Sequence, residues 1–322
     1  MQHHLRSRSV ILVILSFVIP VSLVQLAEEA AYAEARSDRR FWPDPSAAHA
    51  AQDSTANFAA IDSNYTASQI SATEVNTLTV QIFLPWVMVN PTPSCPTTSA
   101  ATFETIPIDG NRTDRPDYLH GDLNLSLRGY AAVDSAKTLQ DYNGTADPGA
   151  PQLAGLFDPN QFPGISTVHR VYSWDWGCGL NGCPGPPVTD PDVTLMGLTT
   201  SPGQAIFIPE RSPNLYGGGY KALVLYAEEQ RITLGYTRRD SVAPGYAVHL
   251  ENLCVDPNLL ALYREQVGPD GLRIFKNGSY WLPALRLDQA LGTALADEIR
   301  VSIRDRGTFM DPRSRKDWWL GY

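Results

Sequence analysis

The sequence lacks the short motifs that identify the common enzyme families. It has no HExxH or HxH metal pattern, no GxSxG turn around a nucleophilic serine, no Walker loop and no dinucleotide-binding fingerprint. Histidine is scarce as well, because only His49, His120, His169 and His249 follow the N-terminal apolar stretch. We therefore expect no cofactor and no bound metal, and the sequence favours a protein that is not an enzyme.

Positive charge is also in short supply. The chain has 25 Lys and Arg against 34 Asp and Glu, which gives a formal net charge of −9. A basic patch that could neutralise phosphates is missing, so nucleic acid is excluded as a partner. A second long apolar run is missing too, since the best candidate, 78–89, contains Gln81 and Pro85.

The N-terminus has the features of a secretory signal. Arg6 and Arg8 precede an uncharged apolar run over 10–24, which is shorter than the ~20 residues of a spanning helix. Small residues then offer cleavage sites after Ala33 or Ala35. An uncleaved membrane anchor is the alternative. Either way, we expect the rest of the chain to be extracellular or in the cell envelope, with the membrane contacted only through this segment.

Composition divides the remainder into two regions. Residues 36–72 are rich in Ala, Ser, Asp and Asn with few large apolar side chains, which predicts a disordered linker after the 1–35 segment. Residues 73–322 carry strand signals throughout and predict a β-rich extracytoplasmic domain. The pattern also allows a division of this domain into 73–165 and 166–322.

Four cysteines in an exported chain predict two disulfides. Cys178 and Cys183 bracket the turn-forming residues GLNG, so we expect them to pair with each other and to leave Cys95 for Cys254. A zinc knuckle is the alternative, but no second pair of cysteines has metal-ligand spacing and no histidine is near.

The predicted fold is mainly β, with antiparallel sheets in a barrel- or sandwich-like body. Gly and Pro together make up 49 of the 322 residues, which suits short strands joined by turns. The clearest hairpin is 221–237. Strands are predicted at 77–89, 103–108, 123–130, 168–174, 193–198, 204–209, 221–227, 230–237, 245–253 and 298–304.

One short surface helix is predicted near 257–267. Asp256 can cap it, and Pro257 suits its first position because that residue needs no N–H there. Leu259 and Tyr263 share a face that can pack on a sheet, and Gly268 ends the helix.

Two pairs of residues are candidates for catalysis. His249 and Glu251 lie two apart on a predicted strand, so the imidazole and carboxylate share one face and could act as an oriented base. His120 and Asp122 lie in a polar loop that could bind a cation or supply half of a carboxylate pair. The alternatives are a structural polar pair at 249–251 and a capped turn with Asp122 paired to a buried Arg128.

An aromatic cluster is the candidate ligand-binding surface. It comprises Tyr172, Trp174, Asp175 and Trp176, directly before the predicted disulfide loop. Indole faces can stack on sugar rings while a carboxylate bonds hydroxyls, although alternate aromatics more often pack in a core. In the C-terminal stretch 303–322, Trp318 and Trp319 are expected to anchor the tail on apolar surface.

Two resemblances accompany these patterns. HGDLNLSLRGY, ITLGYTRRD and RDRGTFMDPRSRKDWW, within 77–320, resemble uncharacterised secreted bacterial proteins. Residues 203–313 resemble the late part of lysostaphin-type zinc peptidoglycan endopeptidases, in the DQALG turn at 288–292 and the ending at 307–312. Arg300 falls where that family has a zinc-ligating histidine, and a guanidinium offers no lone pair. The resemblance thus implies a related fold without the zinc site.

The leading hypothesis is an exported, non-catalytic β-rich protein of the cell envelope that binds wall glycan or another polysaccharide. The alternative is a secreted hydrolase, peptidase-like or directed at glycans, that uses His249, Glu251, His120 or Asp122. A structural component of a surface assembly is the third hypothesis.

Overall fold

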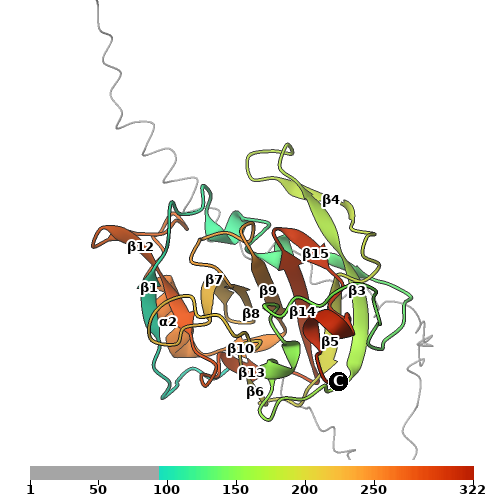
Figure 1. Cartoon of the computed structure of the whole chain (residues 1–322). Helices are drawn as coiled ribbons and strands as arrows, with labels where there is room; N and C mark the ends of the chain where they lie inside the picture. The colour runs from blue at the N-terminus through green and yellow to red at the C-terminus, as the bar shows by residue number, and fades with distance from the viewer. Residues whose placement is uncertain (1–93) are drawn as a thin grey trace, which may run out of the picture. The chain divides into compact units, whose positions relative to one another are not determined.

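The computed structural model describes residues 94–322. The predicted signal segment, the predicted linker and the strand expected at 77–89 lie outside the described residues. Within the described part, the prediction of a mainly β fold with antiparallel sheets is confirmed (Figure 1).

One large antiparallel sheet dominates the structure (Figure 1). In spatial order its main path contains β1 (Glu104–Pro107), β12 (Ser279–Leu285), β7 (Ala222–Glu228), β8 (Arg231–Gly235), β9 (Tyr246–Glu251), β14 (Glu298–Asp305), β5 (Leu195–Thr199), β3 (Ile165–Asp175) and β2 (Tyr130–Ala132). Three short strands pair beside this path, namely β4 (Cys183–Pro187) with β3, β11 (Phe275–Lys276) with β12, and β15 (Thr308–Met310) with β14. Strands from both sides of residue 165 therefore share this sheet.

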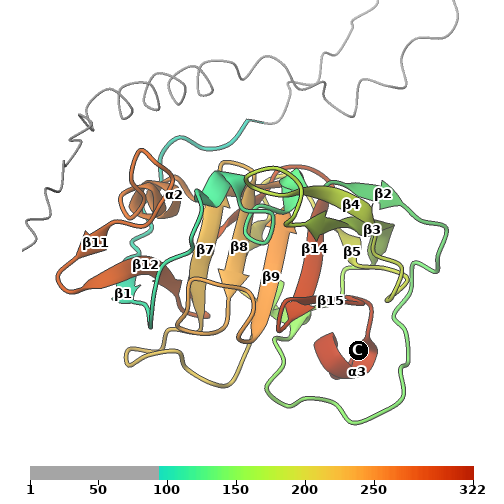
Figure 2. The ribbon, with the colours of Figure 1, turned by 90° about the horizontal axis from the view of Figure 1, so that it is seen from above.

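The smaller elements surround this sheet. A second sheet has the order β10 (Leu253–Val255), β13 (Gly292–Ala294), β6 (Ala205–Ile206). The helices are η2 (Asp117–Leu119), η3 (Leu125–Leu127), η4 (Leu153–Leu156), α2 (Pro257–Arg264) and α3 (Arg315–Trp318). Figure 2 shows the connection after β2 sweeping around α3 and the C-terminus.

The two faces of the main sheet differ in chemistry, because successive side chains of a strand point to opposite faces. On β14, Ile299, Val301 and Ile303 are buried in the main hydrophobic core. The alternate residues of the same strand, from Glu298 to Arg304, are polar. This polar face is where the candidate catalytic residues lie.

Local sequence signals predicted several elements correctly. The hairpin at 221–237 is confirmed as β7 and β8, which meet at Glu228 and Arg231 across a tight turn. The helix near 257–267 is confirmed as α2, and Asp256 accepts hydrogen bonds from the backbone N–H groups of Asn258 and Leu259. Leu259 and Tyr263 are buried beneath it, as expected.

The strand predicted at 123–130 is wrong. Residues 125–127 form η3 instead, and a strand begins only at Tyr130. The Asn124 side chain accepts hydrogen bonds from the backbone N–H and the hydroxyl of Ser126, which stabilises the turn against an extended backbone. Strand β4 was not predicted, because its proline-rich sequence lacks the N–H donors of a typical strand. Sheets tolerate proline at their edges, where β4 lies.

Both predicted disulfides are present, Cys95–Cys254 and Cys178–Cys183. They indicate that the chain folds in an oxidising, extracytoplasmic environment. Within residues 94–322, none of the helices has the length and apolar character needed to cross a bilayer.

Candidate functional site

His249 is enclosed within the polar face of the sheet. It lies between Thr233 on β8 and Ser302 on β14, and only 1% of its surface is exposed. The Thr233 hydroxyl donates to the carbonyl of Leu123 at 2.6 Å and lies 2.9 Å from His249 Nδ1. Because that hydroxyl has one hydrogen, Nδ1 is the donor to it. Burial, together with the charges of Arg304 and Arg128, holds the pKa of His249 well below its ordinary value.

Glu251 belongs to a row of alternating charges across four strands. Glu228, Arg231, Glu251 and Arg300 are successive partners in the register of β7, β8, β9 and β14. Glu251 is buried, and its Oε1 lies 3.5 Å from Arg231 Nε. Burial raises the pKa of Glu251, against the opposing charges of Arg231 and Arg300. The row thus neutralises itself within the sheet.

Glu298 extends this row on β14. Its carboxylate accepts from Ser166 Oγ at 2.5 Å, Thr167 Oγ1 at 2.7 Å and Arg300 Nε at 2.8 Å. A Cβ at Gly197 would lie 2.2 Å from Glu298 Oε2, so the glycine is what admits the carboxylate. Burial opposes ionisation, but these three donors together lower the pKa of Glu298.

His120 and Asp122 lie above the same face of the sheet. Asp122 Oδ1 accepts from Arg128 at 2.5 Å and from Arg304 of β14 at 2.7 Å. Burial opposes ionisation of Asp122, but Arg304 and Arg128 outweigh it and lower its pKa. His120 Nδ1 accepts from the backbone N–H of Asp122 at 3.2 Å. Over residues 94–322, His, Cys, Asp and Glu nowhere gather into a group that could hold a metal ion.

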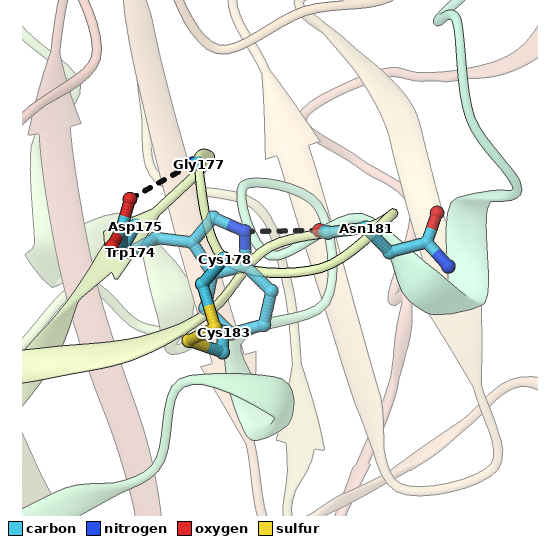
Figure 3. The surroundings of a disulfide bond; sticks show 6 residues. All are labelled: Trp174, Asp175, Gly177, Cys178, Asn181 and Cys183. Carbon is cyan, nitrogen blue, oxygen red and sulfur yellow. Dashed lines mark hydrogen bonds between the residues drawn. A yellow bond between two sulfur atoms is a disulfide. The ribbon is translucent and has the colours of Figure 1, made fainter.

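Trp174 holds the tip of the β3–β4 hairpin together (Figure 3). Its indole N–H donates to the carbonyl of Asn181 at 3.3 Å, inside the loop closed by the Cys178–Cys183 disulfide. A Cβ at Gly182 would lie 2.2 Å from Trp174 Nε1, and one at Gly121 would lie 2.5 Å from the ring. Trp174 is therefore a packing residue of the hairpin and of the neighbouring loop.

Trp176 is the member of the predicted aromatic cluster that presents a ring to solvent, with 37% of its surface exposed. The Arg115 guanidinium lies over its ring, 4.4 Å from the centroid, and the His120 ring is edge-on to it with the two ring centroids 5.1 Å apart. Asp175 is exposed, but its carboxylate accepts from the N–H of Gly177 at 2.8 Å within its own turn (Figure 3). Tyr172 is half-buried beside Gly129.

A groove that the sequence did not predict lies at the base of the β3–β4 hairpin. Its volume is about 380 Å³. It is lined by the loop after β2, the residues that follow β4, and the C-terminal tail, namely Tyr142, Asn143, Asp190, Pro191, Thr308, Phe309, Met310, Asp311, Ser314, Lys316, Asp317 and Trp318. Phe309 and Trp318 are buried, whereas Tyr142 is 44% exposed.

The Tyr142 ring is fixed in the groove by a buried ion pair. Its hydroxyl donates to Asp311 Oδ2 at 2.6 Å, and the same oxygen accepts from Arg313 at 2.7 Å. Burial and the neighbouring Asp311 raise the pKa of Tyr142 to about 12, so the phenol stays protonated and keeps donating. No sequence pattern indicated this contact, because 169 residues separate Tyr142 from Asp311.

The polar groups of the groove are of two kinds. Asp317 accepts from Ser314 Oγ at 2.6 Å and from Lys316 Nζ at 2.7 Å, so these side chains bond each other. The side chains of Asn143 and Asp190 are exposed and make no hydrogen bond or ion pair within residues 94–322. These two groups are therefore open to a ligand.

A smaller cavity of about 230 Å³ lies beside Cys254. Asp256 is the single charged residue among those that line it. That carboxylate already caps α2 and accepts from Ser99 Oγ at 2.5 Å.

Comparison with protein families, with curated proteins and with solved structures gave no match.

Proposed function

We propose that this protein is exported, remains at the cell surface or envelope, and binds glycan without catalysing a reaction. The predicted signal segment and the two disulfides support export. The ligand class follows from the groove at the base of the β3–β4 hairpin.

The observation that carries this proposal is the chemistry of that groove. The groove is lined by the Tyr142 ring, which its hydroxyl holds in place, by the buried Phe309 and Trp318, and by the exposed side chains of Asn143 and Asp190. Sugar rings combine apolar faces, which pack on aromatic rings, with hydroxyls that bond amides and carboxylates. The volume of about 380 Å³ is at the lower end of the range for small-ligand sites and suits one or two sugar units.

Hydrolysis is the second candidate, and one observation favours it. Burial raises the pKa of Glu251, whereas hydrogen bonds lower that of Glu298. Carboxylates whose pKa values are pushed apart often act as acid and base. Against this candidate, each carboxylate contacts arginine, and neither lines a cavity described above. We therefore favour binding.

The proposal can be tested by co-sedimentation with insoluble peptidoglycan and with a panel of insoluble polysaccharides. We expect at least one of them to retain the unaltered protein. Tyr142→Ala should weaken retention about tenfold, which corresponds to about 1.4 kcal/mol for a lost aromatic contact. Tyr216→Ala is the matched control, because Tyr216 is also 44% exposed but lies outside the groove.

Two results would contradict glycan binding. One is that none of the polymers retains the unaltered protein. The other is that Tyr142→Ala and Tyr216→Ala behave alike. Release of soluble sugar during the incubation, and its loss in Glu251→Gln, would favour hydrolysis instead.

A further inference from the structure

We infer that Trp176, at the tip of the hairpin, is a second contact for the same ligand, so that the ligand is a polymer lying along β4 from the groove to the tip. This inference rests on the proposed function and specifies the class of glycan, an extended chain rather than a single sugar.

Strand β4 connects the two contacts directly. The tip ends at Cys183 where β4 begins, and the chain continues past Pro187 to Asp190 on the rim of the groove. At about 3.3 Å per residue, β4 alone is on the order of 13 Å long from Cys183 to Pro187. One sugar unit cannot reach both ends, so only an extended chain would benefit from both.

The surface between the two contacts is open. Pairing within residues 94–322 places β4 against β3 alone, and Figure 1 shows this hairpin projecting beyond the main sheet. Pro184, Pro186 and Pro187 are exposed along it. Proline rings give the strand an apolar surface while removing the N–H donors that would recruit another strand. This edge suits a polysaccharide better than an added β-strand.

The tip holds Trp176 in place before any ligand arrives. The disulfide closes the loop, Trp174 donates to Asn181 within it, and Arg115 and His120 contact the Trp176 ring (Figure 3 shows the disulfide and Trp174). A side chain that is already ordered loses little conformational freedom on binding, so its contact contributes more to affinity. Two fixed contacts on one polymer also raise the effective concentration of the second.

The inference predicts that the two contacts respond differently to ligand length. The probes are glycan strands freed from peptidoglycan by amidase digestion, separated by length, and the disaccharide unit alone, with binding measured by calorimetry. Trp176→Ala should weaken binding of long strands about tenfold and leave that of the disaccharide within twofold. Tyr142→Ala should weaken both, and Trp176→Tyr should restore part of the loss.

Phe275→Ala is the control. Phe275 is 62% exposed and lies on the β11–β12 hairpin, outside the groove. Urea unfolding of each variant verifies that it is folded. If Trp176→Ala matches Phe275→Ala at every length while Tyr142→Ala weakens binding, the tip is not a contact and the groove alone binds. If the unaltered protein binds no strand, the proposed function fails together with this inference.

The exposed tip also carries Leu180, which is 90% exposed, so a lipid surface is the competing partner. Vesicles of anionic and of neutral phospholipid form a separate arm of the experiment. Vesicle binding that Trp176→Ala abolishes, with strand binding unchanged, would overturn the inference and assign the tip to the membrane.

Discussion

Side chains at the centre of the polar face and on the flank, which comprises β4, the hairpin tip and the groove, differ in how far they are already bonded within the protein. In the centre, His249 and Glu251 are buried and Asp122 is partly buried, and each contacts groups from neighbouring strands or loops. On the flank, Trp176, Asn143 and Asp190 remain exposed. Reactive side-chain types therefore indicate a site only where their bonding capacity is not already used inside the protein.

The largest effect on stability is expected from removing a buried charge at the centre of the polar face. Arg304→Met removes a buried guanidinium that bonds Asp122 and the carbonyl of Gly307. Loss of one partner leaves buried polar groups uncompensated, so the free energy of unfolding should fall by about 3 kcal/mol. Urea unfolding measures this change.

The matched control is Arg315→Met. Arg315 pairs with Asp141 at 2.8 Å, but both side chains are largely exposed. Its removal should alter the free energy of unfolding by less than about 1 kcal/mol. Equal losses in the two variants would contradict the distinction between buried ion pairs of the centre and exposed ones at the surface.

The next largest effect on stability is expected from removing the Cys178–Cys183 disulfide at the hairpin tip. Cys178→Ser combined with Cys183→Ser opens a loop whose ends are 5 residues apart. Chain entropy predicts a loss of about 2 kcal/mol, because closing so short a loop constrains the unfolded chain only modestly. The near-ultraviolet circular dichroism of Trp174 should change as well. A variant with unaltered stability and spectrum would show that the disulfide does not order the tip.

A smaller effect appears in the pH dependence of stability. The folded protein keeps His249 neutral because its pKa is lowered, whereas the unfolded chain protonates it near pH 6.5. The contribution of His249 to the free energy of unfolding is therefore fully present above about pH 6.5. Below that pH it falls by up to about 1.4 kcal/mol per pH unit. His249→Gln should flatten this slope between about pH 6.5 and 5. An unchanged slope would mean that His249 is protonated in the folded state.

The smallest effect on stability is expected from Asn143→Ala and Asp190→Ala. Both side chains are exposed and unpaired within residues 94–322, so the free energy of unfolding should change by less than about 0.5 kcal/mol. Glycan affinity should nevertheless fall severalfold in each. If a variant unfolds more easily, or binds glycan as well as the unaltered protein, that side chain is not a ligand-binding group of the groove.

The sequence predicted what short-range signals determine. The hairpin of β7 and β8, the capped helix α2 and the pairing of Cys178 with Cys183 each depend on residues close together in the chain. The remaining disulfide followed by elimination. The spacing of His249 and Glu251 placed both on one face of β9, as alternation requires.

Long-range contacts account for what the sequence did not predict. Tyr142 and Asp311 meet across 169 residues, and no local pattern of either segment indicates the other. Trp174 belongs to the aromatic cluster for which the sequence allows either ligand binding or packing, and Gly121 and Gly182 leave its ring room to pack inwards. The candidate site therefore had to be identified from the folded structure.

The central claim is that a glycan occupies the groove at the base of the hairpin. The most direct measurement is hydrogen–deuterium exchange of the purified protein with and without a saturating concentration of amidase-released glycan strands. The account predicts slower exchange confined to 138–145, 176–191 and 308–318. Slower exchange around His249 and Glu251 instead, or no change anywhere, would contradict it.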